Sequence, residues 1–127
     1  MANECNPFYR PGTNLPCRAG VPLTGKKFVA ATAAMDPQAG VNLTVGLPAA
    51  GGEVVGVAAR NAVAGAVVNV ISGRGKVLPV TAGAAITFNQ KLQVDATGAV
   101  VPLAAGVAVG VALGAAASGA DCPVRLY

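Results

Sequence analysis

A gapless internal repeat constrains this chain more than any other feature of its sequence. Shifting the sequence by 54 positions superposes 48–70 on 102–124, with identical residues at 11 of 23 positions. In a chain so rich in Ala, Gly and Val, roughly five matches would arise by chance. The two segments are therefore expected to share one local fold, and a structure that one copy excludes is excluded for the other.

The second copy by itself resembles a membrane segment. Residues 96–120 carry no charge, and the glycines from Gly106 to Gly114 follow the GxxxGxxxG spacing of packed transmembrane helices. The large apolar residues supply only about −3 to −4 kcal/mol of insertion free energy, and the glycines and Pro102 oppose a helix. The first copy contains Arg60 at its centre, which a membrane span would not tolerate. The repeat therefore predicts strands, and a small membrane protein with a span at 100–120 is the weaker alternative.

Short β-prone runs separated by turn residues occupy most of the chain. The first copy predicts strands at Glu53–Ala59 and Ala66–Ser72, and the second predicts Val107–Leu113 and a closing strand to Leu126. Six further runs have the same character: Lys26–Ala34, Val41–Val45, Lys76–Thr81, Ala84–Phe88, Lys91–Val94 and Ala99–Leu103. We expect an all-β fold, a small β-barrel or β-sandwich, with a helix in Ala30–Ala39 left open.

The first 25 residues differ from the rest. Prolines recur every four to six residues, which removes backbone donors and favours extended conformations. Two of the five aromatic residues, Phe8 and Tyr9, lie here and would serve well as anchors on a partner. We expect an extended Pro-rich N-terminal arm over 1–25 and a β domain over 26–127; a disordered tail is the alternative for the arm.

Charge composition favours a protein that other proteins cover. Only 11% of residues are charged, which is sparse for a free-standing soluble monomer. The net charge of +4 favours acidic partners. Clustered Lys and Arg interleaved with aromatics, as nucleic-acid binding requires, are absent from the sequence, so no nucleic-acid partner is expected.

Catalytic and metal-binding chemistry is not expected. The chain has no His, and its five acidic residues are scattered without a paired-carboxylate motif. No cofactor site, metal site or enzymatic activity is predicted. The three cysteines, Cys5, Cys17 and Cys122, form no CxxC pair; free thiols or a Cys5–Cys17 bridge are both compatible with the sequence. The N-terminus lacks the basic start and apolar run of a signal peptide.

The second half carries a familiar string of motifs. In order these are AGAAIT (82–87), QKLQVD (90–95), GAVVP (98–102), GVAL (110–113), ASG (117–119) and VRL (124–126). The string resembles the small capsid decoration (cement) proteins of tailed bacteriophages, over roughly residues 45–127. Asn89 stands where that family usually has Gly, and Asn tolerates the positive φ that such a turn needs.

The resemblance implies a structural virion protein. Such proteins bind the outer surface of the capsid, often as trimers, and clamp neighbouring major capsid subunits; assembly would take place in the host cytoplasm. We hypothesise that the arm crosses onto a neighbouring subunit and that the partner contacts are Phe8, Tyr9, Arg10, Arg18, Lys26 and Lys27. Another virion component, such as a head-fibre base or a tail protein, is the alternative.

Overall fold

The computed structural model describes residues 14–35 and 43–127, and within these ranges it contains strands and no helix. The strands are β1 (Asn14–Ala19), β2 (Phe28–Ala33), β3 (Thr44–Gly46), β4 (Gly56–Ala58), β5 (Val67–Ile71), β6 (Val77–Thr81), β7 (Lys91–Val94), β8 (Val100–Pro102), β9 (Gly110–Ala112) and β10 (Asp121–Leu126). The predicted all-β fold is confirmed.

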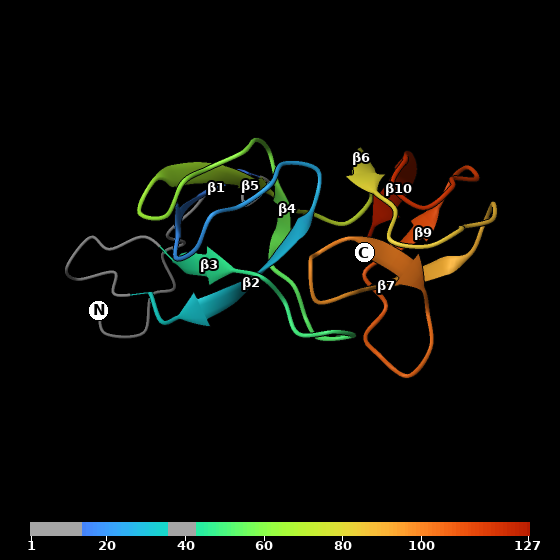
Figure 1. Cartoon of the computed structure of the whole chain (residues 1–127), viewed down its shortest axis with the longest axis horizontal. Helices are drawn as coiled ribbons and strands as arrows, with labels where there is room; N and C mark the ends of the chain where they lie inside the picture. Colours follow the sequence, from blue (N-terminus) through green and yellow to red (C-terminus); the bar gives the residue numbers. More distant parts are fainter. Residues whose placement is uncertain (1–13, 36–42) are drawn as a thin grey trace, which may run out of the picture.

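Two five-stranded units lie side by side (Figure 1). The first half forms a closed barrel in the order β1-β3-β2-β4-β5, and the second half forms a sheet in the order β6-β10-β9-β7-β8. The strand pairings of the two halves correspond. The pairs β1–β5 and β4–β5 are equivalent to β6–β10 and β9–β10. The pairs β2–β4 and β2–β3 are equivalent to β7–β9 and β7–β8. Each half is therefore one copy of the same motif.

The structural repeat is longer than the sequence repeat. The strands β4 and β5 match β9 and β10 at the predicted shift of 54 positions, from Gly56 to Gly110. The strands β1 and β2 match β6 and β7 at a shift of 63 positions, from Cys17 to Val80. Lys26 and Asn89, the two non-glycine residues with positive φ among those described, are equivalent at this second shift. The repeat thus includes the turn before β2 and the turn before β7.

Most predicted strands are present, and three local expectations differ. Of the run Ala84–Phe88, only Ile86 forms a bridge. Residues 30–33, which a helix was allowed to occupy, belong to β2. The alternative of a membrane helix at 100–120 is wrong, because these residues contain β8 and β9. In the part of the chain that the structure describes, no helix is long and apolar enough to cross a membrane.

The body begins earlier than the predicted boundary at residue 26. Residues 14–19 form β1, which pairs with β5 along its length and with β3 at its end. Cys17 and Ala19 are buried in the barrel while Arg18 between them points outward, so this segment alternates as a half-buried strand does. Proline spacing hid this alternation in the sequence. Residues 1–13, the remainder of the predicted arm, lie outside the described residues.

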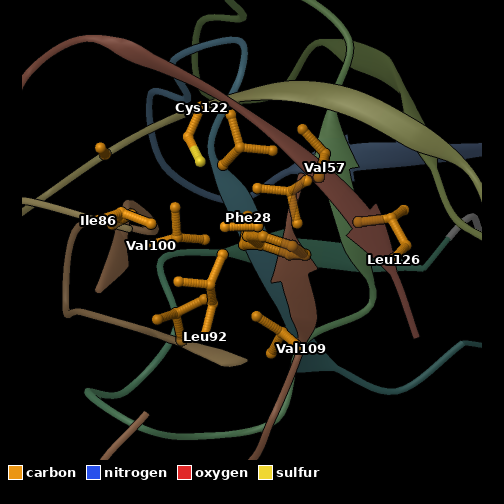
Figure 2. Close-up of a cluster of buried hydrophobic side chains, with 13 residues drawn as sticks. Phe28, Val57, Ile86, Leu92, Val100, Val109, Cys122 and Leu126 are labelled. Atoms are coloured by element: carbon orange, nitrogen blue, oxygen red, sulfur yellow. The ribbon is translucent and has the colours of Figure 1, made fainter. Parts of the chain in front are cut away.

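Two hydrophobic clusters form the core, one in each half, and the cluster of the second half also contains residues of the first half. The first cluster contains Cys17, Val45, Val68 and other residues of the first half only. The second cluster is larger and includes Phe28 and Val57, which belong to the first half. Figure 2 shows the Phe28 ring near the centre of this cluster, among Leu92, Val100, Val109 and Leu126.

The segment Lys26–Phe28 explains how Phe28 reaches the other half. The amide of Thr81 on β6 donates to the carbonyl of Lys26 at 2.8 Å, and the amide of Phe28 donates to the carbonyl of Gly98, beside β8, at 2.9 Å. In the first half, the equivalent of Thr81 is Arg18, whose amide bonds directly to Leu43 and helps to close the barrel. The first half therefore inserts three residues into the gap between β6 and β8 and fills the core behind it.

Candidate docking surfaces

The predicted partner contacts divide into two groups. Phe8, Tyr9 and Arg10 lie outside the described residues. Arg18, Lys26 and Lys27 are described, on β1 and on the turn before β2. Arg18 lies beside Arg60 in the first half, whereas Lys26 and Lys27 lie at the junction between the halves.

Arg18 and Arg60 approach the same short segment from two sides. Nη1 of Arg18 donates to the Gly65 carbonyl at 3.0 Å, and Nη2 of Arg60 donates to the Val67 carbonyl at 2.7 Å. Both arginines are exposed, so two positive charges are held near the start of β5. Sequence reasoning proposed Arg18 but not Arg60, because only the pairing of β1 with β5 brings the two together.

Lys26 and Lys27 lie at the junction between the halves. Nζ of Lys26 forms an ion pair with Oδ2 of Asp121 at 2.8 Å, with both side chains about half exposed. A pair this exposed contributes roughly 0.2–1 kcal/mol, and its charge is largely balanced. Lys27 is half-buried, and its Cβ packs near Gly98. Among the three described candidates, Arg18 thus has the most freedom to contact a partner through its charge.

A groove of about 220 Å³ runs between the two halves. Its walls are equivalent segments of the repeat, 53–56 with 72–73 on one side and 107–109 with 126–127 on the other, and Phe28 contributes to its lining. Glu53 is its one charged lining residue, and Val107 and Tyr127 give it an apolar rim. The described lining holds no His, Lys or second carboxylate side chain that could pair with Glu53 for acid–base chemistry.

The buried side chains of the described residues also lack groups suited to catalysis or metal binding. No polar or charged side chain is buried, and no cluster of His, Cys, Asp or Glu could hold a metal ion within the described ranges. Cys17 and Cys122 are free and buried, and burial raises the pKa of both thiols, which keeps them protonated and unreactive. These surfaces are suited to binding other macromolecules through shape, apolar area and positive charge.

Comparison with known protein families gives one decisive match. The sequence model of the phage cement protein family matches residues 21–126, which is most of the chain. The chain belongs to the phage cement protein family. It is accordingly a structural component of a phage virion. This agrees with the resemblance seen in the second half and extends it through the first half.

A solved structure has the same fold as this cement protein. It is described as the head fiber gp8.5 N base in bacteriophage phi29. The two chains superpose with a TM-score of 0.74 over 90% of this chain and 92% of that one, at 18% sequence identity. A search of curated proteins finds no match. The likeness at this identity establishes that both chains have the two-unit β architecture.

Proposed function

We propose that this cement protein decorates the outer surface of the capsid and clamps neighbouring major capsid subunits, acting as a homotrimer. The observation that carries the proposal is the family match over residues 21–126. The absence of catalytic groupings among the described residues and the exposed cations on β1 and near β5 support a binding role. Clamping requires only binding energy, because a protein that bridges two subunits raises the effective concentration of each for the other.

The N-terminal arm supplies the second contact in this proposal. Asn14, the first described residue, pairs with Ile71 at the end of β5, so an arm over residues 1–13 would start from this end of the barrel. Fully extended, 13 residues reach about 43 Å at ~3.3 Å each, far enough to meet an adjacent subunit. Phe8 and Tyr9 would anchor the arm while Arg10 and Arg18 face acidic capsid surface.

Removal of the arm tests this function. The truncation should stop at residue 13, because removal of 14–22 would take β1 out of the barrel. We expect protein lacking 1–13 to keep its circular dichroism spectrum and to lose most binding to capsids that lack the decoration. Occupancy by cryo-electron microscopy equal to that of the full chain would contradict the role of the arm. Light scattering on the free protein checks the trimer.

Clamping has a separate measurement. Shells carrying the full protein should break at a higher temperature than undecorated shells, because opening must also break the added contacts. Unchanged shell stability at full occupancy would show decoration without clamping.

The fold favours one second candidate, the base of a head fibre. The similarity to the phi29 head fiber base covers nearly the whole chain. In that case, virion images should show a fibre continuing outward from each bound copy. A bare, rounded density would favour decoration.

A further inference from the structure

The two halves of the repeat have equivalent outer sheet faces, of which one is buried and the other is exposed. In the first half, a row of outward residues runs Phe28, Val57, Ile71 across β2, β4 and β5. The second half packs on this row: Phe28 and Val57 are 2% exposed and belong to the second hydrophobic cluster. The outer face of this sheet is therefore an established interface within the chain.

No described segment of the chain packs over the equivalent row of the second half. This row runs Lys91, Val111, Arg125 across β7, β9 and β10 and continues to Val77 on β6. Lys91 is exposed, and Val77 is 53% exposed. Lys91 and Arg125 stand at the places of Phe28 and Ile71 in the first row, so this face carries two positive charges where the first has apolar side chains.

A second row enlarges the apolar part of this face. Pro123 on β10 lies opposite Pro79 on β6, and the amide of Leu113 donates to the carbonyl of Pro123. Pro79 and Pro123 are exposed, and Leu113 is 40% exposed. The first half has Ala59, Asn69 and Pro16 at the same places, which is a smaller and more polar set. Exposed apolar residues gathered on one sheet face indicate a surface that binds something.

The two cations of the face form no ion pair with an acidic residue in the part of the chain that the structure describes. The ion pair among the described residues joins Lys26 to Asp121, and neither Lys91 nor Arg125 takes part in it. An apolar centre with unpaired cations at its border complements an apolar patch bordered by carboxylates. A second copy of the same face would instead oppose cation to cation.

We infer that the outer face of β6, β7, β9 and β10 docks this protein on the capsid shell, against an apolar patch bordered by carboxylates. The residues that define this docking face are Val77, Pro79, Lys91, Leu113, Pro123 and Arg125. The inference rests on the proposed function and adds to it a contact that is independent of the arm. In this arrangement the capsid shell covers the outer sheet face of the second half, just as the second half covers the equivalent sheet face of the first half.

A matched pair of substitutions tests the docking face. Val77→Asp and Leu113→Asp place a carboxylate in its apolar centre, whereas Leu47→Asp places one just after β3 of the first half, at an apolar residue that is 50% exposed and lies outside the docking face. Binding of the full-length proteins to undecorated capsids is measured by co-sedimentation. We expect both face variants to bind about tenfold more weakly or worse and Leu47→Asp to bind as the unmodified protein does. Circular dichroism checks that all of the variants are folded.

A charge variant gives a second readout. Binding of the unmodified protein should weaken as salt rises, and the double variant Lys91→Gln, Arg125→Gln should show a smaller salt dependence. Face variants that bind as Leu47→Asp does would overturn the inference while leaving the proposed function intact. Failure of the unmodified protein to bind shells would overturn both. A change of oligomeric state in the free face variants, with capsid binding unaltered, would assign the face to a second copy and overturn the inference as well.

Discussion

Phe28 is the residue on which the two halves depend most. Its backbone belongs to β2 of the first barrel, and its side chain is buried in the cluster of the second half (Figure 2). The equivalent residue in the second half is Lys91, which is exposed. The same position in the repeat is therefore a core residue in one copy and a surface residue in the other, because the described residues cover the sheet face of the first copy and leave that of the second copy open.

Replacing Phe28 by Ala should destabilise the protein strongly. The substitution removes a fully buried ring and leaves a cavity that the surrounding strands can fill only in part, so we expect a loss of about 3–5 kcal/mol in the free energy of unfolding. Phe88→Ala is the matched control, since Phe88 is 69% exposed and its loss should change stability by no more than ~0.5 kcal/mol. Urea unfolding of both variants gives the comparison, and similar losses would show that Phe28 is not a core residue.

At the scale of strands, β9 and β10 approach so closely that only glycine fits between them. A Cβ on Gly110 would lie 2.6 Å from Cγ1 of Val124 and 2.7 Å from the carbonyl oxygen of Arg125. Gly56 meets Ile71 and Val70 in the same way on β4. Gly110 belongs to the glycine spacing that resembles a membrane helix, and Gly56 is its equivalent in the first copy; the role of both is to allow close packing of strand pairs.

Gly110→Ala should therefore lower the free energy of unfolding more than a glycine substitution in an open turn does. We expect a loss of about 2–4 kcal/mol, because the backbone of β10 must move to make room. Gly119→Ala is the control: its φ is +87° but nothing lies within 4 Å of the added carbon, so backbone strain alone should cost roughly 1–2 kcal/mol. Thermal unfolding of the two variants gives the order, and a greater loss for Gly119→Ala would contradict the close approach.

The strand scale also shows how far the sequence could predict this fold. The copies at 48–70 and 102–124 were recognisable because they align without a gap, and their strands are found as β4, β5, β9 and β10. The earlier strands of each half were missed as a repeat because the segment from the start of β2 to the start of β4 is nine residues longer than the segment from the start of β7 to the start of β9, which changes the shift from 63 to 54. Pairs such as Phe28 and Lys91 differ for a further reason, since only one of them faces the other half.

The candidate site was less predictable from the sequence than the fold. Arg18 was chosen for its charge, and the docking face was not predicted at all. Val77, Leu113 and Arg125 lie far apart in the sequence and become neighbours only through the pairing of β6, β9 and β10. The order of these strands follows from long-range pairing, which local residue preferences do not encode.

The whole molecule should unfold as one cooperative unit although it consists of a five-stranded barrel and a five-stranded sheet. The second half shares its core with Phe28 and Val57, and Lys26 and Phe28 supply backbone bonds to Thr81 and Gly98. On the other side of the junction, the amide of Gly51 donates to Val94, and that of Val107 donates to Gly51. Neither half can open without exposing part of the core or the hydrogen bonds of the other, which is the physical condition for a single transition.

Hydrogen exchange of native amides can separate one cooperative unit from two. Val68→Ala truncates a side chain that is buried in the first cluster only and should cost about 2–3 kcal/mol. If the halves are coupled as the shared core indicates, the slowest-exchanging amides of β10 should lose as much protection as those of β5, because both then exchange through global unfolding. Protection that falls in β5 while β10 is unchanged would show that the second half stays folded alone, and the insertion of Lys26–Phe28 would then hold together two independent units.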